Sequence, residues 1–129
     1  MQYITSRGCH GRCRFCVMSH LFKGSLLLKP KNQIISELQS LLQSYEINAI
    51  YFSDDNTFAS DSEAIDICNI INGLTNGQGI PWRCSTRIDT LSRLSADTYS
   101  KLVDSGYKGV VVGIESGVDR VLELMGKRI

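Results

Sequence analysis

Strand-like and helix-like segments alternate along this chain, and the alternation limits its fold more than any other feature. The strand-like runs are residues 2–5, 48–53, 81–86 and 109–114. Apolar residues at helical spacing follow them at 33–45, 60–74, 96–105 and 116–125. Four such pairs in 129 residues average about 32 residues each, the length of a repeat in which a helix crosses between parallel strands. The sequence therefore predicts an α/β fold with a parallel sheet.

The number of units limits how far the sheet can close. A closed barrel of eight strands needs about 250 residues, so four βα units form only part of one. The predicted fold is a partial parallel (β/α) barrel with two unpaired edges, either part of a larger barrel or a sheet that a partner chain completes. The alternative is a small doubly wound sheet, which has the same order of elements. We expect residues 1–129 to form one domain.

Capping residues and apolar patterning mark the element ends. Ser60 and Glu63 form a capping-box pattern, in which each side chain can bond a free backbone N–H of the other residue. Ser95 and Ser116 are the predicted N-caps of the two later helices. The run at 109–114 is apolar without alternation, which is typical of a strand buried on both faces.

Composition and charge narrow the class of protein. With 43% hydrophobic and 21% charged residues, the chain is an ordinary globular domain and not a disordered one. No apolar run approaches the roughly 20 residues of a membrane span, and residues 1–7 lack a signal-peptide pattern, so we expect a cytoplasmic location. Residues 1–36 carry six bases and no acid, but a net charge of +1 for the whole chain makes nucleic acid an unfavoured partner.

Three cysteines lie within eight residues of this basic segment, in the pattern Cys9-x3-Cys13-x2-Cys16. Thiols stay reduced in the cytoplasm, so a metal site is favoured over disulfides. A structural zinc ion could take these three thiolates and His20. An iron–sulfur cubane with only three cysteines would instead keep one iron open to another ligand. Nearby bases would offset the negative charge of such a cluster: Arg7, Arg12 and Arg14.

Polar side chains follow the predicted strands. They are Ser53, Asp54 and Asp55 after the second strand, Ser85 and Arg87 after the third, and Glu115 after the fourth. Because the carboxyl ends of parallel strands meet at one edge of the sheet, we expect an active site there. The structural alternatives are turn and capping roles for the aspartates, an Arg87–Asp89 surface ion pair, and a helix-end contact for Glu115.

These residues together resemble the radical S-adenosylmethionine (SAM) enzymes. The cysteine motif follows a first strand and has an aromatic residue, Phe15, before its last cysteine, which is similar to that family's signature. Three strand-end motifs extend the resemblance along the chain: Asp54-Asp55-Asn56, Arg87-Ile88-Asp89 and Gly113-Ile114-Glu115-Ser116-Gly117. They are similar to motifs of the subgroup that often carries a cobalamin-binding domain. The resemblance implies that residues 1–129 are a partial radical SAM core.

The resemblance also implies cofactors, partners and contacts. Cys9, Cys13 and Cys16 would hold a [4Fe-4S] cluster whose fourth iron binds the amino and carboxylate groups of SAM. An electron from a reductant such as flavodoxin or ferredoxin would split SAM and give a 5′-deoxyadenosyl radical that acts on a small-molecule substrate, with cobalamin as a candidate further cofactor. Residues after the second strand would lie near the methionine amino group. Those after the third would face its carboxylate, and Glu115 would lie by the ribose hydroxyls or the methionine end.

The competing hypothesis from the sequence is a protein without catalysis. In that case the cysteines bind zinc, or a partner completes an inactive, truncated barrel. No residue is predicted to be catalytic by itself, because the residues that select the substrate are expected on strands outside these four units. Cys68 and Cys84 are expected to be core residues in either case, since they lie on an apolar helical stripe and in a strand.

Overall fold

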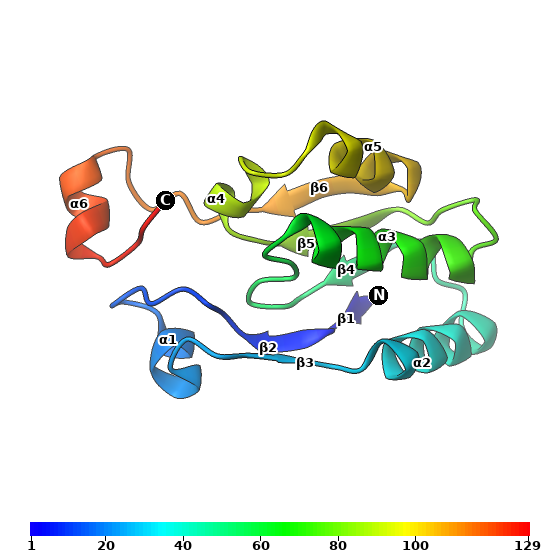
Figure 1. The fold of residues 1–129 in the computed structure, drawn as a ribbon. Helices are drawn as coiled ribbons and strands as arrows, with labels where there is room; N and C mark the ends of the chain where they lie inside the picture. The colour runs from blue at the N-terminus through cyan, green and yellow to red at the C-terminus, as the bar shows by residue number, and fades with distance from the viewer.

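Four parallel strands in sequential order form the main sheet of the computed structural model, which describes residues 1–129 (Figure 1). The sheet order is β1 (Gln2–Tyr3), β4 (Ile50–Phe52), β5 (Trp82–Ser85) and β6 (Tyr107–Val111). A doubly wound sheet reverses its strand order at a switch point, whereas neighbours here follow one another as in a sector of a barrel. The predicted partial (β/α) barrel is confirmed, and both of its outer strands have one unpaired edge.

Three long helices pack beside one another against this sheet. They are α2 (Lys31–Ser44), α3 (Asp61–Leu74) and α5 (Ala96–Asp104), with α3 between the other two (Figure 1). Their buried side chains are Ile34 and Leu38 of α2, five residues of α3 that include Ile67, Cys68 and Ile71, and Thr98 and Leu102 of α5. Cys68 and Cys84 both lie in this core, as predicted.

A row of aromatic rings crosses all four strands. Tyr3, Phe52, Trp82 and Tyr107 contribute one ring from each strand, and consecutive ring centroids lie 6.3, 5.5 and 4.9 Å apart in edge-to-face geometry. Edge-to-face pairs at such distances add to the free energy gained from burial alone. The row therefore holds the strands together from one edge of the sheet to the other.

Two of the predicted helix caps are confirmed. The hydroxyl groups of Ser60 and Ser95 each accept a hydrogen bond from the backbone N–H three residues later, at the starts of α3 and α5. The Glu63 carboxylate reaches back one residue further than the capping box predicts, to the N–H of Ala59. The cap predicted at Ser116 is wrong, because its hydroxyl binds the N–H of Val118 and the helix α6 (Asp119–Leu124) begins after that residue.

The prediction of a strand buried on both faces at 109–114 is also wrong. The observed strand, β6, begins two residues earlier and pairs only with β5. Its last residue, Val111, is 58% exposed, and Ile114 beyond it is 55% exposed. An edge strand of a parallel sheet can thus have an apolar sequence without being covered on both sides.

Four short elements were not predicted. β2 (Ser6–Gly8) and β3 (Leu26–Leu28) form an antiparallel hairpin, α1 (Val17–Phe22) lies between them, and α4 (Ile88–Leu91) follows β5. In the hairpin Ser6 is buried while Leu27 is 61% exposed, the reverse of the usual pattern. None of the helices has the length and apolar character needed to cross a bilayer.

Candidate active site

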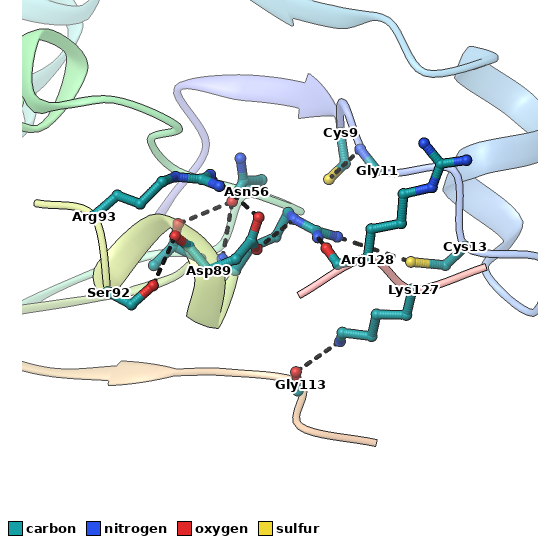
Figure 2. A network of polar contacts seen from close by, with 12 residues as sticks. Cys9, Gly11, Cys13, Asn56, Asp89, Ser92, Arg93, Gly113, Lys127 and Arg128 are labelled. Atoms are coloured by element: carbon teal, nitrogen blue, oxygen red, sulfur yellow. Dashed lines mark hydrogen bonds and ion pairs between the residues drawn. The ribbon is translucent and has the colours of Figure 1, made fainter. Parts of the chain in front are cut away.

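The cysteine loop lies between β2 and α1, at the carboxyl end of the main sheet's first strand. Gly11 is at its centre, and its backbone N–H donates to the Sγ atom of Cys9 over 3.3 Å. A Cβ atom at Gly11 would lie 3.4 Å from Cys9 Sγ, 3.8 Å from Cys13 Sγ and 3.0 Å from Nη1 of Arg87. Two thiols and a guanidinium therefore lie close around Gly11, and Figure 2 shows the contact between Gly11 and the Cys9 sulfur.

The third cysteine begins the following helix. Cys16 is half-buried and is the N-cap residue of α1, with extended backbone geometry. Its carbonyl oxygen accepts from the N–H of Ser19 and lies 3.0 Å from Nδ1 of His20. His20, the predicted fourth ligand of a zinc ion, thus contacts a backbone carbonyl. No three Cys, His, Asp or Glu side chains are gathered closely enough to hold a single metal ion.

Soft thiolates in one loop suit an iron–sulfur cluster, which is wider than one ion and so needs its ligands farther apart. Burial raises the pKa of the Cys9 thiol, while the Gly11 N–H and the positive charge of Arg87 act in the opposite direction. A bound metal requires the thiolate, which a nearby cation and a backbone donor both stabilise. The loop therefore has the ligand type, the close backbone and the compensating charge that a cluster requires.

Arg87 connects the strand end to the cysteine loop and to the end of the chain. Its Nε atom lies 2.8 Å from Oδ1 of Asp89, Nη1 lies 3.9 Å from Cys13 Sγ, and Nη2 donates to the carbonyl of Arg128 over 2.5 Å. Burial lowers the pKa of its guanidinium, but the Asp89 carboxylate and the thiols raise it by more. The Arg87–Asp89 ion pair named above as a structural alternative does exist. It is not a surface pair, because its side chains are 17% and 16% exposed.

Asp54 holds the segment between β1 and β2 in place. Its Oδ1 atom accepts from the backbone N–H groups of Thr5 (2.7 Å) and Ser6 (2.5 Å) and from both hydroxyl groups. Its other oxygen, Oδ2, is buried and has no hydrogen-bond partner. The neighbouring Asp55 is exposed and accepts from the N–H of Gly8 over 2.9 Å. Both carboxylates therefore fix the backbone immediately before the cysteine loop.

The remaining predicted site residues lie at the same edge with different partners. The hydroxyl of Ser53 donates to the Tyr3 carbonyl over 3.4 Å, and that of Ser85 pairs with the Tyr51 hydroxyl at 2.9 Å. Glu115 has a left-handed backbone, with φ of 62°, and its Oε1 atom accepts from the Lys127 ammonium over 3.0 Å.

Three residues at this edge were not selected from the sequence. Lys127 is 7% exposed and also donates to the Gly113 carbonyl over 2.6 Å (Figure 2). Asn56 is fully buried, and its Oδ1 atom accepts from the Thr86 hydroxyl and the Arg87 N–H. Arg128 provides the carbonyl that Arg87 binds. Asn56 belongs to the quoted strand-end motif, whereas no local pattern marks the two residues near the end of the chain.

The end of the chain also packs directly on the cysteine loop. The backbone N–H of Arg14 donates to the Met125 carbonyl over 2.8 Å, and its guanidinium donates to the Leu124 carbonyl over 3.3 Å. A Cβ atom at Gly126, which has φ of 66°, would lie 3.3 Å from the carbonyl of Arg12. Residues more than a hundred positions apart thus form opposite walls of one site.

Comparison with known proteins agrees with this geometry. The chain matches the radical SAM superfamily over residues 3–129. It is 35% identical over 126 residues to an uncharacterised methyltransferase of Pyrococcus horikoshii, covering 98% of this chain and 26% of that protein. It is 28% identical over 127 residues to a cytidylyl-2-hydroxyethylphosphonate methyltransferase of Streptomyces wedmorensis, and the match covers 98% of this chain and 23% of that protein. A hopanoid C-2 methylase of Rhodopseudomonas palustris is 34% identical over 62 residues, and this match covers 48% of this chain and 12% of that protein.

The chain belongs to the radical SAM superfamily. This confirms the family and the enzyme class that the cysteine motif predicts. A [4Fe-4S] cluster and SAM are the cofactors that this superfamily implies. The chain spans about a quarter of the length of the two curated relatives that it matches over 98% of its own residues.

Proposed function

We propose that this chain forms the part of a radical SAM enzyme that holds a [4Fe-4S] cluster and SAM. The observation that carries the proposal is the convergence of the Cys9 and Cys13 thiols and the Arg87 guanidinium on Gly11, at the carboxyl edge of a partial barrel. When bound, the cluster and SAM would supply a 5′-deoxyadenosyl radical that takes a hydrogen atom from a substrate.

In this proposal the cysteine thiolates hold the cluster and the strand-end residues hold SAM. Cys9, Cys13 and Cys16 are the three thiolate ligands. Arg87 binds the methionine carboxylate with its forked guanidinium, and Ser85 lies beside it. The positive charge of Arg87 also offsets the negative charge of the thiolates. The unpartnered, buried Oδ2 atom of Asp54 suits the methionine ammonium, since a buried carboxylate oxygen gains most from a charged donor.

The same proposal assigns lesser contacts to the other strand-end residues. Ser53 and Asp55 flank Asp54 on the ammonium side, and Asp55 also fixes the backbone of Gly8. Glu115 gives one carboxylate oxygen to Lys127, and its second oxygen is assigned to the ribose hydroxyls.

For the whole protein we propose methyl transfer to a small molecule, with a low-potential reductant such as flavodoxin or ferredoxin. Support comes from the three relatives described above, which are named as methyltransferases or as a methylase. Cobalamin is the proposed methyl carrier, on the strength of the strand-end motifs and of the partial match to the hopanoid methylase. A partner segment that completes the barrel beside β6 is part of the same proposal, because that edge is open.

Anaerobic reconstitution with iron and sulfide tests the cluster. We expect a brown protein with close to four irons per chain, whose visible spectrum shifts when SAM is added. Cys13→Ala should lose the colour, whereas Cys68→Ala, which removes a core thiol far from the loop, should keep it. Dithionite reduction with SAM should then yield 5′-deoxyadenosine. A colourless protein with one tightly bound zinc would instead support the structural alternative.

A further inference from the structure

A cleft of about 470 Å³ opens beside the cysteine loop. It lies between that loop, the segment after β4, helix α4 and the end of the chain. Five of its lining residues are arginines: Arg12, Arg14, Arg87, Arg93 and Arg128. The only acid in the lining is Asp89, so its formal charge is +4. Cavities of about 300–1,000 Å³ are the usual size for small-molecule sites.

Most of this positive charge has no carboxylate partner within the protein. Asp89 is shared between Arg87, at 2.8 Å, and Arg93, at 3.2 Å. The other three guanidiniums form no ion pair with any carboxylate of the chain. Like charges held close together repel one another and attract anions.

An unsatisfied hydrogen-bond donor lies in the same wall. Asn56 is fully buried, and its amide oxygen accepts from the Thr86 hydroxyl and the Arg87 N–H. The backbone N–H of Arg87 can only donate, so it fixes the orientation of the amide and leaves the Nδ2 group without a partner. A buried donor without an acceptor is unfavourable, so this lining residue gains from an acceptor that the chain itself does not supply. Figure 2 shows Asn56 between Arg93 and the cysteine loop, with Arg128 extending toward Gly11.

We propose that this cleft binds a phosphoryl or phosphonyl group of the substrate. The assignment to a substrate rests on the proposed function, since the cleft includes Gly11 and so adjoins the cysteine loop. The proposed cluster, a 2+ core with three thiolates, would carry one negative charge and the carboxylate of SAM another, so together they would balance two of the four excess charges. A phosphoryl dianion would balance two more and would present three acceptor oxygens to guanidinium forks and to the Asn56 amide.

Calorimetric titration of the chain with inorganic phosphate, repeated at several fixed ionic strengths, tests the binding site. We expect saturable binding of one phosphate per chain that weakens as salt is raised. Arg93→Gln and Arg128→Gln should each weaken it at least about tenfold. Arg120→Gln is the matched control, because Arg120 is exposed on α6 and lies outside the cleft. No saturable binding, or an equal loss in Arg120→Gln, would show that the proposal is wrong.

A second titration separates this site from that of SAM. The reconstituted chain is titrated with SAM in the presence and absence of saturating phosphate. We expect the affinity for SAM to stay within about twofold, because the two ligands occupy different places. Competition between them would mean that the arginines serve SAM itself, which would overturn the substrate assignment. Loss of the iron colour with retained phosphate binding would count against the proposed function alone.

Discussion

The hydrogen bonds of Asp54 suggest a measurement on how the cysteine loop is anchored. One carboxylate oxygen accepts from two backbone N–H groups and two hydroxyl groups, all of them in Thr5 and Ser6. In Asp54→Ala the hydroxyls can turn to other acceptors, but the two buried N–H groups cannot. Each unsatisfied buried donor costs about 1–3 kcal/mol, so the free energy of unfolding should fall by about 2–6 kcal/mol.

Asp54→Asn is the more discriminating change. The amide keeps an acceptor oxygen for the two N–H groups but loses the negative charge. Bonds to a charged acceptor are worth about 1.5–3 kcal/mol and bonds to a neutral one about 0.5–1.5 kcal/mol, so two bonds should lose about 2 kcal/mol together. Asp55→Ala, which removes a single part-buried bond from the Gly8 N–H, should cost about 1 kcal/mol.

Urea unfolding followed by tryptophan fluorescence measures all three variants. Trp82 is the only tryptophan and is 1% exposed in the centre of the sheet, so its emission reports the core and not the loop. The expected order of stability is wild type and Asp55→Ala first, then Asp54→Asn, then Asp54→Ala. If Asp54→Ala unfolded within about 0.5 kcal/mol of wild type, the anchoring role derived from these bonds would be refuted.

Other predictions concern the loop glycine, a titrating surface cluster and the backbone. Gly11→Ala should lower the iron content after reconstitution, because the new Cβ presses on the guanidinium and a thiol, while Gly117→Ala, with nothing within 4 Å, should not. The Lys29 ammonium lowers the pKa of Glu37 from 4.5 to about 2, so its stabilisation is complete above pH 4.5 and is lost as pH falls toward 2. In Glu37→Gln the urea concentration at the midpoint of unfolding should therefore depend less on pH between 4.5 and 2 than it does in the wild type. Gly106→Ala, at φ of 92° with a backbone carbonyl 2.5 Å from the new Cβ, should destabilise the fold strongly.

Local signals explain what could be predicted of the fold. The Ser60 and Ser95 caps were predicted because a cap depends on residues three positions apart, and the alternation of elements gave the sheet. The β2–β3 hairpin was missed because its polar Ser6 is buried while Leu27 and Leu28 are exposed. That reversal arises from Asp54, a residue 48 positions away whose carboxylate needs the Ser6 hydroxyl and N–H.

In the candidate site, too, local signals separate the residues that could be selected from the sequence from those that could not. The cysteines could be selected because their spacing is local, and Arg87 because it follows a strand directly, and their roles as ligands stay a prediction. Lys127 and Arg128 could not be selected, since their partners lie 14 and 41 positions away and no periodicity connects them. The unpaired amide of Asn56 depends on which atoms surround it and so cannot be inferred from its place in a motif.

The packing of the last residues on the cysteine loop has a consequence for biosynthesis. The bond from Arg14 to Met125 joins residues 111 positions apart, so the loop leaves the ribosome long before its covering wall exists. At about 5–20 residues per second, the delay is on the order of 5–20 seconds. During that interval the three thiols lack the wall that residues 124–126 form, so they stay accessible to oxidants until the end of the chain has folded onto the loop.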